Sequence, residues 1–240
     1  MSETMLLSAR GMYKVRSDRD RQIRMEIQDF TVAEGAVIGV AGPNGCGKST
    51  LLDMLGLLLP PDGVEAFQFA GRDVKALSDA GKAGLRRSAF AYILQRCGML
   101  EFLTIEKNLE FAMRIKGGAA ADSTGSAHWR ETAARFRLDG LLGKYPAKVS
   151  GGQRQRAAIA CAVVQNPKVI FADEPTAALD PASASDALAV FQELAHERGI
   201  TLVVVSHDHA LLDKWADAVY HFHVEEQGST VLSRLSLSGR

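Results

Sequence analysis

A short apolar segment that leads through a glycine-rich turn into a helix constrains the fold of this chain more than any other feature. Residues Ala36–Ala41 are apolar or glycine and predict a buried strand. The glycine-rich turn follows directly, and a helix is expected from about Lys48 to about Leu59, where two prolines stop it. A buried strand followed at once by a helix is the start of an α/β arrangement.

The second half of the chain repeats this alternation. The apolar segment Val169–Ala172 and the β-branched segment Thr201–Val205 are predicted strands, and the periodicity of Ala182–Arg198 predicts a helix between them. Buried strands separated by helices imply an α/β fold with a mostly parallel sheet whose two faces are covered.

Two regions depart from this pattern. The first 35 residues are expected to be rich in β structure, with Arg16–Arg21 as a solvated hairpin tip or, alternatively, an anion-binding patch. Residues 95–145 have a helical pattern, interrupted by a flexible loop at Gly117–Gly125. We interpret this middle region as a helical lobe inserted into the α/β core.

Composition excludes several classes of protein. The 240 residues are 47% apolar, which is typical of a globular chain, and 28 basic residues balance 28 acidic ones, so no overall positive charge points to nucleic acid. No apolar run approaches the ~18 residues of a membrane span, and we expect no signal peptide. The three cysteines, Cys46, Cys97 and Cys161, favour reduced thiols over disulfides or a metal site.

The turn after the first predicted strand has the complete pattern G-x-x-x-x-G-K-[ST]. Its residues are Gly42, Pro43, Asn44, Gly45, Cys46, Gly47, Lys48 and Ser49. Glycines let successive backbone N–H groups point at one anion, and the following helix adds the positive end of its dipole. Lys48 is expected to reach the β- and γ-phosphates, and the Ser49 hydroxyl to bind Mg²⁺. The motif predicts binding of a nucleoside triphosphate but does not separate kinases, GTPases and transport ATPases.

Two carboxylates follow the strand Val169–Ala172. Strands of a parallel sheet end at one edge, so Asp173 is expected near the Mg²⁺ at Ser49. Glu174 could act as a general base on the attacking water. Because Pro175 disfavours a helical backbone before it, we expect Glu174 to keep the extended geometry of the strand.

Ser150, Gly151, Gly152 and Gln153 precede a predicted helix that runs to about Gln165. The spacing of Ser150 and Gln153 is that of a helix capping box, and the same geometry could bind an anion.

The histidines carry a weaker signal. His207 follows a strand, and without other motifs it would be interpreted as a structural or solvated residue. His221 and His223 alternate on a probable strand without a third metal ligand.

Together these residues resemble the ATP-binding cassette (ABC) ATPases from about residue 5 to about residue 224. The resemblance identifies Gly42–Thr50 as Walker A, Gln95 as the Q-loop glutamine, Val149–Gln153 as the signature, Val169–Glu174 as Walker B, Ala178–Asp180 as the D-loop and His207 as the switch histidine. It implies one nucleotide-binding domain over residues 1–240, with a P-loop NTPase core, an N-terminal antiparallel β subdomain and an α-helical subdomain at about 96–165. Val149, Ser206 and Cys46 differ from the most frequent family residues in ways that should preserve packing and binding.

The resemblance also implies roles for these residues. The catalytic residues would be Lys48, Gln95, Glu174 and His207. The ligands of Mg²⁺ would be Ser49, Gln95 and Asp173. Tyr13 would stack on the adenine of ATP. In a head-to-tail dimer, the signature residues Ser150, Gly151, Gly152 and Gln153, with Asp180, would complete the ATP site of the neighbouring copy. The segments Leu100–Leu109 and Ala172–Asp180 are similar to the subgroup that serves lipoprotein release, macrolide export and cell division.

The function that follows is an ATP-hydrolysing subunit that energises a separate membrane-spanning permease through ATP-driven dimer closure. The chain would lie in the cytoplasm at the inner face of the membrane, paired with a second copy or a paralogue. The alternative is a soluble ABC ATPase that acts on DNA or ribosomes. A single cassette without heptads or net positive charge makes that alternative the weaker hypothesis.

Overall fold

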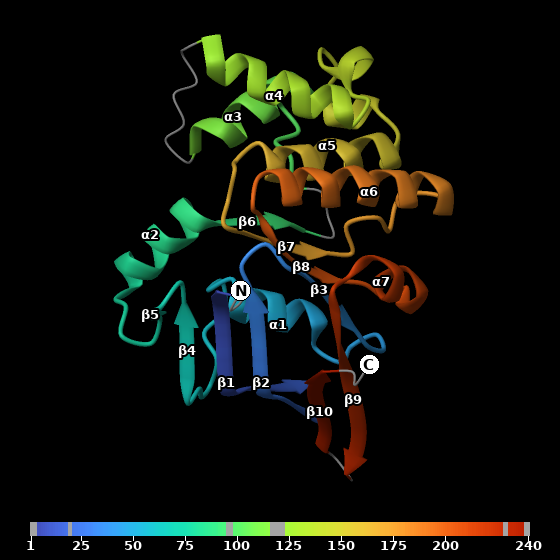
Figure 1. Cartoon of the computed structure of the whole chain (residues 1–240). Coiled ribbons are helices and arrows are strands. Elements are labelled where there is room, and N and C mark those ends of the chain that lie inside the picture. The colour runs from blue at the N-terminus through green and yellow to red at the C-terminus, as the bar shows by residue number, and fades with distance from the viewer. Residues whose placement is uncertain (1–3, 19–20, 95–97, 116–122, 228–229, 238–240) are drawn as a thin grey trace. The chain divides into compact units, whose positions relative to one another are not determined.

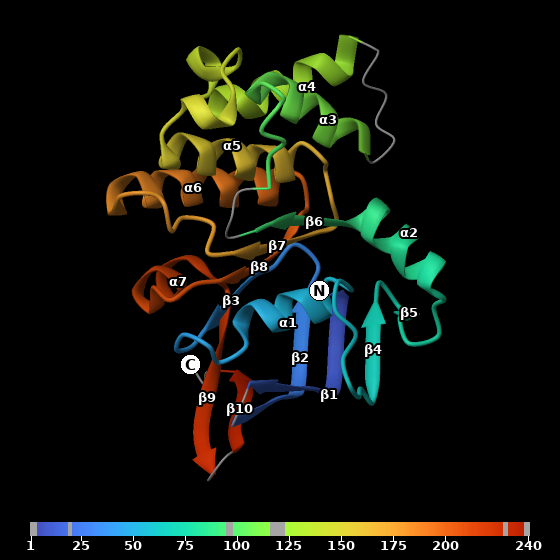
Figure 2. The same cartoon turned by 180° about the vertical axis from the view of Figure 1, so that it is seen from behind.

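The structure is a computed structural model that describes residues 4–18, 21–94, 98–115, 123–227 and 230–237 (Figures 1 and 2). The chain divides into two compact units. Unit 1 comprises residues 1–86 and 201–240, and unit 2 comprises residues 87–200. The boundary falls within helix α2 (Asp79–Ala89).

Unit 1 is built on one mixed sheet with the strand order β5-β4-β1-β2-β10-β9-β3-β8. Its strands are β1 (Met5–Asp18), β2 (Arg21–Ala33), β3 (Val37–Ala41), β4 (Ala66–Phe69), β5 (Arg72–Asp73), β8 (Thr201–Val205), β9 (Ala218–Gln227) and β10 (Thr230–Leu237). Strand β3 pairs in parallel with β8 and β9, whereas β1, β2 and β4 form an antiparallel group that lies side by side in Figure 1. The prediction of a β-rich N-terminal region next to a parallel core is therefore confirmed.

Helix α1 (Lys48–Leu55) is shorter than the sequence predicts, so the expected end near Leu59 is wrong. The N–H of Leu58 donates to the Asp53 carbonyl at 2.7 Å and the N–H of Leu57 donates to the Met54 carbonyl at 3.1 Å. Leu57 has a φ of 61°, so these two bonds form the left-handed closure that commonly ends a helix. The end is set by this closure several residues before the prolines.

Unit 2 contains two parallel strands, β6 (Phe90–Ile93) and β7 (Val169–Asp173). Its helices are α3 (Ile105–Ile115), α4 (Ser123–Arg135), α5 (Gly151–Val163) and α6 (Pro181–Glu197), with 3₁₀ turns at Asp139–Leu141 and Pro146–Lys148. Helix α5 contacts α3, α4, α6 and β6, and runs beside α6 in both views of the chain (Figures 1 and 2). Its alanines and β-branched residues are buried, as expected for a helix surrounded by other elements.

The helical pattern predicted for the middle of the chain is confirmed, but the predicted loop at Gly117–Gly125 is only partly testable. Residues 116–122 lie outside the described residues, whereas Ser123, Thr124 and Gly125 form the first turn of α4, so the loop prediction is wrong there. Ser, Thr and Gly weaken a helix interior but are tolerated at its start, where the N–H groups lack intrahelical partners in any case.

Helix α7 (His209–Trp215) completes the described helices and belongs to unit 1. Its N-cap is Asp208, whose side chain accepts a bond from the Leu211 N–H at 3.0 Å. Within the described ranges, no helix combines the length and the apolarity that a membrane span requires.

Candidate functional site

The glycine-rich loop between β3 and α1 has two positions at which both backbone conformation and space favour glycine. Gly42 and Gly47 have φ values of 155° and 109°, and a Cβ atom at Gly42 would lie 2.8 Å from the Sγ of Cys46. A Cβ atom at Gly47 would lie 2.6 Å from the Sδ of Met25 on β2. The first N–H groups of any helix have no intrahelical partner. In α1, no side chain caps them either. The loop and helix start therefore form a cradle of backbone donors, as an anion site requires.

Lys48 lies against this loop. It is buried, and its ammonium group donates to the carbonyl of Gly42 at 2.8 Å and to the carbonyl of Pro43 at 3.1 Å. The predicted contact with a phosphate would exchange these two bonds for bonds to the anion. The neighbouring Ser49 side chain is exposed at the start of α1 and carries a hard oxygen donor.

Cys46 occupies the inner side of the loop. Its side chain is 3% exposed, and burial raises the pKa of its thiol. The Cys46 carbonyl accepts a bond from the buried Ser233 hydroxyl of β10 at 2.7 Å. The Cys46 side chain is therefore buried beneath the loop, and the expectation that this cysteine preserves nucleotide binding stays a prediction.

Three residues that shape the loop were missed by the sequence analysis. They are Met25 on β2, Phe222 on β9 and Ser233 on β10, which contact Gly47, Gly42 and Cys46 respectively. Nothing in their local sequence indicates this role, because each reaches the loop only through the pairing of β2, β10 and β9 in the sheet.

Tyr13, the predicted adenine contact, lies on β1. Its N–H donates to the Gly63 carbonyl at 2.9 Å, and the Arg24 guanidinium carbon lies 4.4 Å from the centre of its ring. Any side chain at Gly63 would collide with the Tyr13 ring. Arg24 therefore covers one face of the ring, and stacking on adenine would use the other face.

His207 follows β8 at the same edge of the unit 1 sheet as the phosphate loop. Strands β3 and β8 are parallel, with Val40 opposite Val205, so both continue into loops at their carboxyl ends. Ser206 is buried, its N–H donates to the Val40 carbonyl at 3.2 Å, and its hydroxyl accepts from the Asp208 N–H at 3.1 Å. These bonds fix the backbone on both sides of the exposed His207. His221 and His223 lie on β9. Among the described residues, no group of three or more histidine, cysteine, aspartate or glutamate side chains is arranged to hold a metal ion.

In unit 2, the two carboxylates of the acidic motif lie at the end of β7 and directly after it, and they differ in backbone conformation. Asp173 is the last residue of the strand, which therefore ends one residue later than the predicted Ala172. Glu174 is 8% exposed and has a φ of 50°, so the expectation of an extended backbone is wrong. A tight turn begins at this residue, in which the Ala177 N–H donates to the Glu174 carbonyl at 3.2 Å. A left-handed conformation at a non-glycine residue is costly and is often found where function requires it.

The capping box at the start of α5 is confirmed. The Gln153 N–H donates to the Ser150 hydroxyl at 3.2 Å, and the Ser150 N–H donates to the Gln153 side-chain oxygen at 3.0 Å. A Cβ atom at Gly152 would lie 2.7 Å from Leu179, whereas one at Gly151 would make ordinary contacts. Any other residue at position 152 would therefore displace the Leu179 side chain.

Asp180 caps α6 in the same unit. Its carboxylate accepts from the Ser183 N–H at 3.0 Å, and hydrogen bonding from the Ser183 side chain and backbone lowers the pKa of Asp180. Asp180 is thus the N-cap residue of α6, and Pro181 is the first residue of the helix, where proline is favourable.

The structure thus gathers the predicted residues within each unit. Unit 1 brings together Gly42–Thr50 and the His207 loop at one sheet edge, and unit 2 holds Asp173, Glu174, Ser150 and Asp180. Gln95, like Cys97, lies outside the described residues. The roles of all these residues in binding and catalysis stay predictions.

The P-loop class of α/β proteins is defined by an apolar strand, a glycine-rich loop and a helix that begins with free backbone N–H donors. The profile of the family described as "ABC transporter" matches residues 25–177, which is more than half of the chain. The chain therefore belongs to the ABC transporter family.

Relatives agree with this assignment. An uncharacterized ABC transporter ATP-binding protein of Methanocaldococcus jannaschii, MJ1508, is 34% identical over 86% of this chain and 91% of its own length. The macrolide export ATP-binding/permease protein MacB of Syntrophobacter fumaroxidans is 36% identical over 74% of this chain but only 25% of its own length. The match to MacB is thus confined to one part of a longer protein.

A solved structure has the same fold. The dimeric ATP-binding cassette MJ0796, in a post-hydrolysis state with ADP and Pi, superposes with a TM-score of 0.82. The alignment covers 98% of this chain and 100% of that chain, at 26% identity. The α/β P-loop fold predicted from the sequence is therefore confirmed.

Proposed function

We propose that this chain is the ATP-binding and ATP-hydrolysing part of an ABC transport assembly, in which ATP closes two cassettes and so does work on a membrane-spanning permease. The observation that carries the proposal is the cradle at Gly42–Thr50, where glycine backbone, helix start and a buried lysine converge. Such a cradle has one evident use, which is to hold the phosphates of a nucleotide.

The proposal assigns each polar group of the site one task. Lys48 leaves the carbonyls of Gly42 and Pro43 and neutralises the β- and γ-phosphates. Glu174 accepts a proton from the attacking water, and His207 contacts the γ-phosphate. Tyr13 stacks on adenine with the ring face that Arg24 leaves open.

Hydroxyl and carboxylate oxygens suit Mg²⁺, and the exposed Ser49 hydroxyl and Asp173 are donors of this kind. Ser49, Asp173 and Gln95 would hold the ion, which would supply charge neutralisation at the phosphates. This ligand set rests on the resemblance to the family.

The neighbouring copy completes the site in this proposal. Ser150 and the glycines after it offer a hydroxyl and helix-start N–H groups at an exposed position, which suits a γ-phosphate delivered by another chain. The dimeric form of the similar cassette MJ0796 supports a pair. In the head-to-tail arrangement that we propose, Ser150 and Asp180 of one copy would lie at the phosphate loop of the other.

The permease partner is proposed to be a separate chain that holds this one at the inner face of the membrane. Relatives such as MacB carry "ATP-binding/permease" in their names, and the chain matches only a quarter of that protein. Unit 2 also exposes large apolar side chains around α3, with Phe102 75% exposed and Phe111 and Ile115 nearly half exposed. Exposed apolar groups of this kind are suited to a partner contact.

The role of Glu174 gives the direct test of function. Glu174→Gln should retain ATP binding but hydrolyse ATP at least ~10²-fold more slowly, because a general base is lost. The measurement is steady-state phosphate release at saturating ATP, with nucleotide binding followed separately. Glu131→Gln, an exposed carboxylate on α4, is the matched control and should hydrolyse ATP normally. Near-normal turnover of Glu174→Gln would remove Glu174 from the proposed mechanism.

A further inference from the structure

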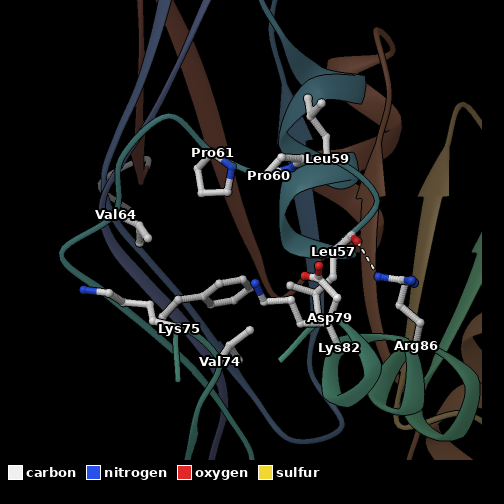
Figure 3. Close-up of a pocket in the computed structure, with 11 residues that line it drawn as sticks. Leu57, Leu59, Pro60, Pro61, Val64, Val74, Lys75, Asp79, Lys82 and Arg86 are labelled. Carbon is white, nitrogen blue, oxygen red and sulfur yellow. Dashed lines mark hydrogen bonds between the residues drawn. The ribbon is translucent and has the colours of Figure 1, made fainter. Parts of the chain in front are cut away.

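Unit 1 contains a cavity of about 460 Å³ that has no part in the site described above. It lies between the turn that ends α1, strand β4 and helix α2 (Figure 3). Its volume falls within the ~300–1,000 Å³ range of small-molecule sites. None of its lining residues belongs to the phosphate loop, so it is a separate feature of the molecule.

The walls of this cavity are apolar. Leu57 and Val64 are half-buried on one side, and Phe67 and Val74 are almost completely buried behind them. Pro60 and Pro61 stiffen the segment that borders the cavity, because proline fixes φ. The walls therefore suit the hydrocarbon or aromatic body of a ligand.

Charged groups of mainly one sign border the same cavity. Three cations, Lys75, Lys82 and Arg86, line it together with one carboxylate, Asp79. Lys82 and Arg86 are four residues apart on α2 and so share one face of the helix. In Figure 3 the Lys82 side chain extends from α2 toward the centre of the lining residues. The excess of positive charge selects an anion.

The three cations differ in how far they are already engaged. The Lys75 ammonium donates to the Glu65 carbonyl at 2.7 Å. One terminal nitrogen of Arg86 donates to the Leu57 carbonyl at 2.8 Å, as the dashed line in Figure 3 shows, which leaves the other N–H groups of the guanidinium for a ligand. Among the described residues, the Lys82 ammonium group has no hydrogen-bond or ion-pair partner. Lys82 and Arg86 are thus the groups available to an acid.

From this combination we propose that the cavity is a binding site for a small organic acid, with its apolar body against Leu57, Val64 and Val74 and its carboxylate between Lys82 and Arg86. An arginine can bind a carboxylate through two parallel hydrogen bonds, and the lysine adds a positive point charge. The site does not depend on nucleotide binding or hydrolysis.

Octanoate is the probe, and octanamide, with the same apolar body and no charge, is its neutral counterpart. Isothermal titration calorimetry on the full chain should detect octanoate below its micellar concentration. Octanamide should bind about tenfold more weakly, because charge-assisted hydrogen bonds are lost. Failure of octanoate to bind, or equal affinity for the two probes, would overturn the proposal.

Charge reversal then locates the site. Lys82→Glu should weaken octanoate binding by about tenfold or more, whereas Lys82→Arg should keep it within a few-fold. Arg87→Glu makes the same kind of change on the same helix, at an exposed residue outside the cavity lining, and should leave octanoate affinity unchanged. Equal loss in Lys82→Glu and Arg87→Glu would show a general charge effect and defeat the assignment.

A cavity-filling variant independently tests where octanoate binds. Val64→Trp puts an indole into the half-buried wall and should abolish octanoate binding while circular dichroism shows a folded chain. In the unaltered protein, amide NMR shifts on adding octanoate should gather at residues 57–67 and 74–86. Undiminished binding to Val64→Trp, or shifts centred elsewhere in the chain, would contradict the proposed site.

Discussion

Individual residues of the phosphate loop are constrained by two separate effects, backbone conformation and space. Gly42 and Gly45 both have a positive φ, but only Gly42 faces neighbours, because a Cβ atom there would meet Cys46 and Phe222 while one at Gly45 would meet nothing within 4 Å. The motif specifies glycine at position 42 and leaves position 45 open, but it does not indicate which neighbours constrain either residue. Their difference is set by β9, which supplies Phe222 and lies far along the chain.

This difference gives a prediction at the scale of the residue. Gly45→Ala should lower the free energy of unfolding by about 1–2 kcal/mol, the cost of a left-handed backbone at an L-residue. Gly42→Ala should cost about 1–3 kcal/mol more, because the added methyl group also overpacks the loop. Urea unfolding of the two variants beside the unaltered protein measures both values. Equal losses would mean that the contacts with Cys46 and Phe222 do not constrain the loop.

At the scale of elements, the start of α5 is tied to the segment that leads into α6. The Ser150–Gln153 capping box fixes the first turn of α5, and Gly152 lies so close to Leu179 that an added side chain would force the Leu179 side chain to move. Leu179 in turn precedes the α6 cap, Asp180, whose carboxylate binds the Ser183 N–H. The signature and the D-loop are therefore packed against each other within residues 150–183.

The matched pair Gly151 and Gly152 tests this packing. Gly152→Ala should lower the free energy of unfolding by about 1–3 kcal/mol, since Leu179 must move. Gly151→Ala should be neutral or stabilising by up to ~1 kcal/mol, because alanine is the better helix former and meets only ordinary contacts. Urea unfolding measures both variants, and hydrogen exchange at 176–181 should rise only in Gly152→Ala. Identical behaviour of the two variants would refute the close packing.

At the scale of the whole molecule, the sequence predicted the class of fold because its signals are local. The segment Thr201–Val205 is a strand with those bounds, and β3 begins one residue later than expected, since buried β-branched runs identify strands without knowledge of their neighbours. What the sequence missed depends either on contacts between distant segments or on local backbone closures. The helix end at Leu55, the turn at Glu174 and the Ser233 bond to the phosphate loop all follow from such contacts or from local closures that composition does not signal.

The central claim is that two copies share each ATP, one through its phosphate loop and the other through its Ser150 segment. Lys48→Ala removes the lysine of a copy's own phosphate loop, and Ser150→Arg blocks the serine that this copy would lend to its partner. Each variant alone should therefore hydrolyse almost no ATP. In a mixed dimer, however, one of the two sites combines the intact phosphate loop of the Ser150→Arg copy with the intact Ser150 of the Lys48→Ala copy.

Measurement of ATP hydrolysis by the two variants, separately and after mixing, tests this claim most directly. The account predicts that activity appears on mixing and rises with the fraction of mixed dimers. Activity that stays at the level of the separate variants, while mixed dimers are shown to form, would contradict it.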